Sequence, residues 1–259
     1  MIARKFRQRL MWAFAIAVAA AVLPARADII DTVARVKGAI VAIGTYDRTR
    51  SPQFVFRGTG FAVEDGTYVV TNAHVVTTVD AAKLELFGIL VPQGGSQALF
   101  REARQVAVDP GKDLALLKTG GTPLPTLKLG ESDRVKDGQT VLFTGFPIGD
   151  VLGLYPATHR GMVSAITPIA IPQGRSADLD PKVIRRLESG AFPVFQLDAT
   201  AYPGSSGSPV YDPDTGEVLG VINMVLVRGT KEAALSQPSG ITYAVPAKYV
   251  RELLQKARQ

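Results

Sequence analysis

The sequence has 259 residues, with 29 Lys and Arg against 23 Asp and Glu, which gives a formal net charge of +6. It contains no cysteine and only two histidines, which excludes disulfides and thiol catalysis and argues against a structural zinc cage; we predict no metal or cofactor. Residues 1–27 carry five of the basic residues and no acids, so the rest has 24 basic and 23 acidic residues. This balance gives no electrostatic reason to expect nucleic-acid binding.

Residues 1–27 have the three-part layout of a secretory signal peptide. A basic head precedes an uncharged stretch of 14 residues from Leu10 to Leu23, and Ala25-Arg26-Ala27 supplies a small-x-small cleavage pattern. A membrane span needs about 20 apolar residues, so this stretch is short for an anchor, although an uncleaved anchor is the alternative. We expect a mature chain of residues 28–259, periplasmic or secreted by a bacterium, with no stable membrane insertion.

The next elements are a short helix and a long series of β-rich runs. Residues 28–37 space apolar side chains as an amphipathic helix does. From Gly38 onward, turn residues separate short runs, which are GAIVAIGTY, FVFRGTGFAV, TYVVT, KLELFGIL, DLALLK, TVLFTGFPI, HRGMVSAI, VFQLD, EVLGVINMVLV and ITYAV. Many short strands without long intervening helices predict an all-β barrel or sandwich.

A Gly- and Pro-rich stretch at 120–125 divides the strands into two groups of about six. We predict one lobe at about 38–119, a second at about 126–245, and a C-terminal helix at about 247–258. The 27 residues of 167–193 interrupt the strand rhythm and include a predicted helical turn. Loops of this length usually carry a function or contain structure of their own. Here the function could be gating of the site, and the alternative is a surface loop without a role.

Three polar residues have distinctive local settings. His74 follows the predicted strand TYVVT, Asp113 opens the run DLALLK, and Ser206 lies in the loop PGSSGSPV. Each alone has an ordinary explanation, as a structural histidine, a strand-end acid or a polar turn. Together they occur in the order His, Asp, Ser, which differs from the orders in α/β-hydrolases and subtilisins, and the hydrolase motif G-x-S-x-G is missing from this loop.

These segments, with 57–76 and 130–149, resemble a chymotrypsin-fold (trypsin-like) serine peptidase, nearest to bacterial HtrA/Deg protease domains and glutamyl-endopeptidase-like peptidases. The resemblance extends over about residues 29–250. It implies two six-stranded antiparallel β-barrels with short terminal helices and the site between the barrels. It also implies polypeptide substrates; HtrA relatives usually carry a PDZ domain, and we expect none in this chain.

The resemblance also assigns roles. Ser206 falls on the nucleophile, His74 on the general base and Asp113 on the acid that orients the imidazole. The backbone N–H groups of Gly204 and Ser206 fall on the oxyanion hole. Ser205 occupies a position that is usually Asn in the family.

The family spacing places Thr200 at the floor of the specificity pocket and Ile222, Asn223 and Met224 along its wall. A neutral Thr200 argues against cleavage after Lys or Arg, and glutamate-specific relatives have a histidine near position 222, which is Ile here. We therefore expect a preference for small to medium apolar P1 residues. His159 is expected to be structural, because the triad already has its base. The alternatives are a catalytically silent peptide-binding or scaffold protein, and an esterase that uses the same triad.

Overall fold

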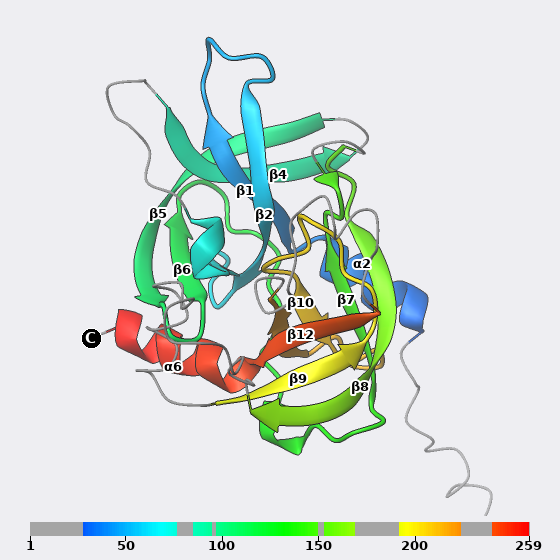
Figure 1. Ribbon diagram of the computed structural model, residues 1–259. Helices are drawn as coiled ribbons and strands as arrows, with labels where there is room; N and C mark the ends of the chain where they lie inside the picture. The colour runs from blue at the N-terminus through cyan, green and yellow to red at the C-terminus, as the bar shows by residue number, and fades with distance from the viewer. Residues whose placement is uncertain are drawn as a thin grey trace, which may run out of the picture.

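The computed structural model describes residues 28–76, 85–94, 97–149, 153–168, 192–223 and 240–258. Their strands form two closed six-stranded antiparallel barrels, with a short helix near each end of the described chain (Figure 1). The fold class expected from the sequence is therefore confirmed. The predicted signal peptide and most of the 167–193 segment lie outside the described residues, among which no helix is long and apolar enough to cross a membrane.

The first barrel follows helix α2 (Ile29–Lys37) and has the strand order β1-β2-β3-β6-β5-β4. Its strands are β1 (Ile40–Tyr46), β2 (Phe54–Val63), β3 (Tyr68–Thr71), β4 (Leu86–Gly94), β5 (Gln97–Asp109) and β6 (Leu114–Thr119). The one-turn 3-10 helix η1 (Ala73–Val75) follows β3 directly.

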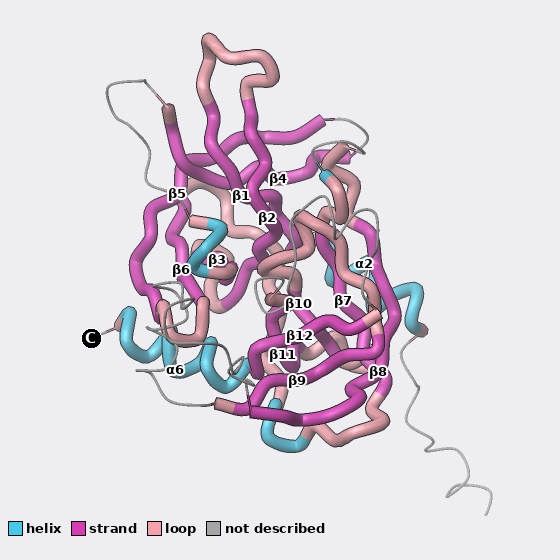
Figure 2. Tube along the Cα trace, viewed as in Figure 1, coloured by secondary structure: helices cyan, strands magenta, loops and turns pink. Residues whose placement is uncertain are grey.

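The second barrel has the strand order β10-β11-β12-β9-β8-β7. Helix η3 (Ser132–Arg134) precedes β7 (Thr140–Gly145), β8 (Ala157–Pro168), β9 (Pro193–Asp198), β10 (Pro209–Tyr211), β11 (Val218–Ile222) and β12 (Ile241–Pro246). Helix α6 (Ala247–Ala257) continues from β12 and contacts β5 and β6 of the first barrel as well as β11 and β12 (Figures 1 and 2). The C-terminal helix therefore joins the two barrels.

The buried apolar side chains fall into three clusters. One includes Ile43 and Leu117 of the first barrel, and another includes Phe143 and Ile222 of the second. The third and largest combines side chains from α2, α6 and both barrels, such as the fully buried Phe61. Apolar burial of this extent between the barrels stabilises their packing against each other.

Two of the twelve strands lie outside the runs predicted from the sequence, namely β5 and β10. The sequence of β5, QALFREARQVAVD, carries charged residues, and its side chains are mostly exposed or half-buried. It therefore lacks the apolar alternation of a half-buried strand. Strand β10 has only three residues and follows the glycine-serine loop directly, so its pairing with β7 and β11 decides its structure.

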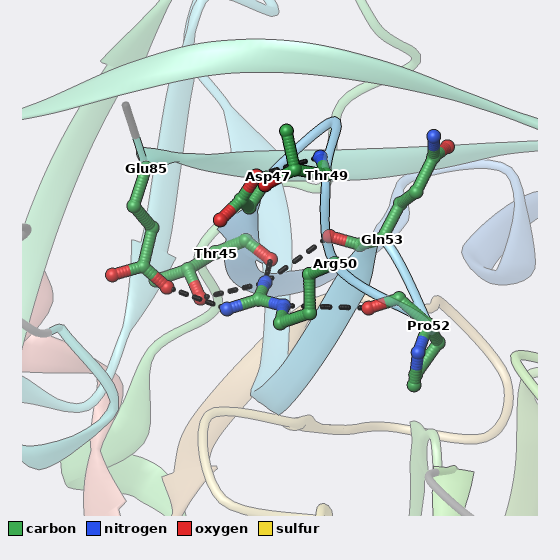
Figure 3. A network of polar contacts seen from close by, with 7 residues as sticks. All are labelled: Thr45, Asp47, Thr49, Arg50, Pro52, Gln53 and Glu85. Atoms are coloured by element: carbon green, nitrogen blue, oxygen red, sulfur yellow. Dashed lines mark hydrogen bonds and ion pairs between the residues drawn. The ribbon is translucent and has the colours of Figure 1, made fainter. Parts of the chain in front are cut away.

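A polar network orders the connection between β1 and β2 (Figure 3). The Arg50 guanidinium donates hydrogen bonds to the carbonyl oxygens of Thr45, Pro52 and Gln53, at 2.8, 3.3 and 3.1 Å. It also pairs with the Glu85 carboxylate at 2.8 Å. One side chain thus satisfies a backbone acceptor at the end of β1 and two in the loop that follows.

His159 is half-buried in the second barrel and packs against its core. Its ring stacks on Phe143, with 4.9 Å between ring centroids and 14° between ring planes. Its Nε2 atom is buried and has no hydrogen-bond partner among the described residues. Burial lowers the pKa of His159, because the protonated ring would lose its solvation. The structural role expected for His159 agrees with this packing.

A pH-dependent term in stability follows from His159. The unfolded chain takes up a proton below about pH 6.5, the ordinary pKa of histidine, while the folded chain resists it. The contribution of neutral His159 to the free energy of unfolding is therefore fully present above that pH. It is lost as the pH falls toward the lower pKa of the folded state. We expect His159→Phe, which keeps a ring on Phe143, to gain stability relative to wild type between pH 7.5 and 5.5. Denaturant unfolding at both pH values measures this difference, and an unchanged difference contradicts the explanation.

Candidate active site

Asp113 lies in the four-residue connection between β5 and β6, and its backbone has a left-handed conformation with φ of +53°. Few residues other than glycine adopt this conformation without support from their surroundings. Here the Asp113 carbonyl oxygen accepts hydrogen bonds from the Ala73 N–H at 3.1 Å and from Asn72 Nδ2 at 3.0 Å. The turn that carries the acid is therefore attached to the residues that precede His74.

The Asp113 carboxylate is buried and faces the imidazole. Its Oδ2 atom lies 2.6 Å from His74 Nδ1 and accepts a hydrogen bond from Asn223 Nδ2 at 3.1 Å, while Oδ1 accepts the His74 backbone N–H at 2.9 Å. The short contact favours a proton on Nδ1, which leaves Nε2 free to act as a base. The His74 side chain stays 25% exposed, so its ring is open to a reactant.

Two glycines shape the loop that carries Ser206. Gly204 and Gly207 have φ values of +95° and +86°. A Cβ atom at Gly207 would lie 2.0 Å from the Thr59 carbonyl oxygen, and one at Gly204 would lie 2.4 Å from the Phe146 carbonyl oxygen. Any larger residue at either position would push the loop away from its neighbours.

The amide groups of this loop divide into two kinds. The N–H groups of Ser205, Gly207 and Ser208 donate to backbone carbonyls at 2.9 to 3.0 Å. Those of Gly204 and Ser206 have no hydrogen-bond acceptor within the described part of the chain. Two unpaired amides beside a serine hydroxyl can bind an oxygen that develops negative charge.

Thr59 of β2 connects the first barrel to this loop, a contact that the sequence analysis missed. Its N–H donates to the Ser206 carbonyl at 2.9 Å, and its Oγ1 donates to the Gly204 carbonyl at 2.8 Å. The same Oγ1 accepts the Phe146 N–H at 3.1 Å. Its position within the segment Gly58-Thr59-Gly60 was the available signal, since flanking glycines permit close approach of two backbones.

Gly58 lies beside both Val75, the residue after His74, and the backbone of Ser206. A Cβ atom at Gly58 would lie 2.7 Å from Val75 Cγ2 and 3.1 Å from the Ser206 carbonyl oxygen. The neighbour of His74 and the serine loop therefore pack on one glycine. No hydrogen bond joins the His74 ring to the Ser206 hydroxyl in the described structure. Without substrate, such contacts are often longer than in the reacting complex.

The residues expected in the specificity pocket take different positions. Thr200 is half-buried between β9 and the serine loop, whereas the Ile222 side chain lies in the core of the second barrel. Asn223 is buried and directs its amide to the Asp113 carboxylate. Met224 lies outside the described residues. Across the described ranges, no three His, Asp or Glu residues form a group that could hold a metal ion.

Two six-stranded barrels, with a His–Asp pair on the first and a glycine-shaped serine loop on the second, are the architecture of the chymotrypsin-like class. A family model described as "Trypsin-like peptidase domain" matches residues 58–221, and the chain belongs to this family.

Curated relatives share this part of the chain. It is similar to a "Probable periplasmic serine endoprotease DegP-like" of Pseudomonas putida (strain W619), with 32% identity over 200 residues, which are 77% of this chain and 34% of the relative. A protein of the same description from Marinomonas sp. (strain MWYL1) is 32% identical over 201 residues, which are 78% of this chain and 35% of the relative. The chain thus spans about a third of the length of these relatives.

Solved structures share the fold. One described as "HtrA-type protease AlgW with decapeptide" has a TM-score of 0.63 at 23% sequence identity, and the match covers 89% of this chain and 67% of that chain.

The contacts of Thr59 give a prediction for Thr59→Val. The variant keeps the shape of the side chain but leaves the Gly204 carbonyl and the Phe146 N–H without their partner. We expect the free energy of unfolding to fall by roughly 1–3 kcal/mol, the usual cost of unsatisfied buried polar groups. We also expect slower reaction with a fluorophosphonate probe, because the loop loses an anchor. Thr59→Ser keeps the hydroxyl and serves as the control; equal behaviour of the Val variant and wild type contradicts this role.

Proposed function

We propose that this chain is an exported serine endopeptidase whose triad is His74, Asp113 and Ser206. The observation that carries the proposal is the buried Asp113 carboxylate, 2.6 Å from His74 Nδ1, on the barrel that also anchors the serine loop. Membership in the trypsin-like peptidase family supports the same assignment.

The mechanism follows from the roles of these groups. His74 Nε2 takes the proton of the Ser206 hydroxyl as its oxygen attacks the peptide carbonyl carbon. The N–H groups of Gly204 and Ser206 bind the oxygen of the tetrahedral intermediate, an interaction for which each donor contributes on the order of 3 kcal/mol. Asp113 stabilises the imidazolium, which then gives its proton to the leaving amine. Water attacks the acyl-enzyme through the same base and releases the second product.

Two alternatives use the same fold. A silent peptide-binding or scaffold protein keeps these residues without turnover, and an esterase cleaves esters but not peptide bonds. The buried Asp113 carboxylate, held by hydrogen bonds from His74 and Asn223, favours an enzyme over a scaffold, because it fixes the orientation of the imidazole that a base needs.

Probe labelling and proteolysis test the proposal together. We expect a fluorophosphonate probe to modify Ser206 and the protein to cleave unfolded β-casein. Ser206→Ala and His74→Ala should each lower cleavage by about four orders of magnitude or more. Ser205→Ala is the matched control, because it removes the neighbouring buried hydroxyl and should leave both readouts intact.

The other outcomes identify the alternatives. A folded wild-type protein that is not labelled and does not cleave casein is the scaffold. Labelling with hydrolysis of p-nitrophenyl acetate but not of casein indicates the esterase.

We also propose a preference for small to medium apolar residues at P1. The predicted pocket floor, Thr200, is neutral, and position 222, near which glutamate-specific relatives have a histidine, is Ile. Cleavage of a proteome-derived peptide library, read by mass spectrometry, should therefore be enriched in Ala, Val and Leu before the cut bond. A profile dominated by Lys, Arg, Glu or Asp contradicts this specificity.

Export to the periplasm or outside the cell, after removal of residues 1–27, completes the proposal. It is supported by the signal-peptide layout and by relatives described as periplasmic. Polypeptides are the proposed substrates, and a solved relative is described with a decapeptide. N-terminal sequencing of the exported protein separates the cleaved form, beginning at Asp28, from an anchored form that retains Met1.

A further inference from the structure

The turn that delivers Asp113 is closed by the residue before it. The Lys112 backbone N–H donates to Asp109 Oδ1 at 3.1 Å, and Lys112 Nζ lies 3.1 Å from Asp109 Oδ2. Asp109 is the last residue of β5, so both ends of Lys112 are tied to the strand that enters the turn. The residue directly before Asp113 is therefore fixed against the end of β5.

Two aromatic rings from distant parts of the chain surround the Lys112 ammonium. Nζ lies 4.9 Å from the centroid of the Tyr249 ring and 6.0 Å from that of Phe192. The two rings pack edge to face, with 5.3 Å between centroids and 79° between planes, and both side chains are buried. A cation within about 6 Å of a ring centroid is attracted to the ring face.

The charge at Asp109 supports this arrangement. Burial raises the pKa of the Asp109 carboxyl, but the hydrogen bonds from Lys112 and the charges of Lys112 and Lys256 outweigh burial and lower it overall. Lys256 of α6 lies 3.9 Å from Asp109 Oδ2. The ionised carboxylate thus holds Lys112 from one side while the two rings hold it from the other.

Helix α6 carries Tyr249 and Lys256 from the end of the second barrel to Lys112 and Asp109 on the first. It begins directly after β12 and contacts β5 and β6 (Figure 1). Phe192 is the residue before β9, where the described chain resumes after residue 191. Asp113 follows Lys112 directly and has a left-handed conformation, which persists only where the surrounding contacts hold it.

We propose that Lys112 is a positioning residue for Asp113 and that Tyr249 couples the C-terminal helix to the orientation of the triad acid. This inference rests on the proposed function, since it concerns the geometry of that triad. The alternative is a purely structural role, in which the same contacts only attach α6 to the first barrel. That alternative predicts a lower stability with unchanged turnover, whereas positioning predicts a lower turnover in a folded protein.

The decisive variant is Lys112→Met, which keeps the length of the side chain and removes its charge. We expect kcat on an internally quenched peptide, taken from a β-casein cleavage site, to fall about tenfold with KM within about twofold. Misplacement of a catalytic group by about 1 Å can cost roughly a hundredfold in rate, and we expect a smaller shift here. The rate of fluorophosphonate labelling of Ser206 should fall in parallel. Lys112→Arg keeps the charge and should recover most of the turnover.

A matched control is available on the same ring. Lys248 Nζ lies 5.3 Å from the Tyr249 centroid and pairs with Asp133 at 2.7 Å. Within the described part of the chain, Lys248 makes no hydrogen bond or ion pair with residues 110–113. Lys248→Met removes an equivalent cation and should leave kcat unchanged. Kinetics are measured below the melting temperature of every variant, as determined by circular dichroism.

Tyr249→Leu provides an independent second test, with Tyr249→Phe as the variant that keeps the ring. We expect the Leu variant to lose turnover and the Phe variant to retain it. The inference is overturned if folded Lys112→Met has the kcat of wild type, or if Lys112→Met and Lys248→Met lose turnover equally. In either case, labelling of Ser206 in the wild-type protein leaves the proposed function standing. A folded wild-type protein without labelling of Ser206 overturns the proposed function itself.

Discussion

The burial of the Asp113 carboxylate is the constraint on which the rest of the candidate site depends. A buried carboxylate is costly unless hydrogen-bond donors surround it. Here the donors come from both barrels, because His74 follows β3 of the first and Asn223 follows β11 of the second. The acid therefore favours the docked arrangement of the barrels, and the docked arrangement fixes the acid against the imidazole.

The serine loop depends on the same interface. It belongs to the second barrel, yet the hydrogen bonds of Thr59 hold it against β2 of the first. Apolar packing of α2, α6 and both barrels supplies the remaining stabilisation of this interface. Neither barrel alone contains the complete set of contacts. A change far from the site can therefore alter its chemistry when it changes how the barrels meet.

The strand pattern predicted an all-β barrel or sandwich, and the order and local settings of His74, Asp113 and Ser206 suggested a triad. The resemblance to trypsin-like peptidases added the two six-stranded barrels and the role of each triad residue. Strand β5 was missed because its exposed, charged side chains hide the period of a strand, and β10 because three residues are too few to show one. The contacts of Thr59 and Asn223 were missed for another reason. The Thr59–Gly204 and Asn223–Asp113 contacts join residues more than 100 positions apart, and only the packing of the two barrels brings these residues together.

The central claim is that the His74 imidazole on the first barrel acts as the general base for the Ser206 hydroxyl on the second. A crystal structure of the mature protein after reaction with a peptidyl phosphonate tests it most directly. The account predicts a phosphorus–oxygen bond to Ser206 Oγ, with the phosphoryl oxygen about 3 Å from the N–H groups of Gly204 and Ser206 and His74 Nε2 within hydrogen-bond distance of Ser206 Oγ. An adduct on another residue, or a phosphoryl oxygen turned to solvent with the His74 ring facing away, would contradict it.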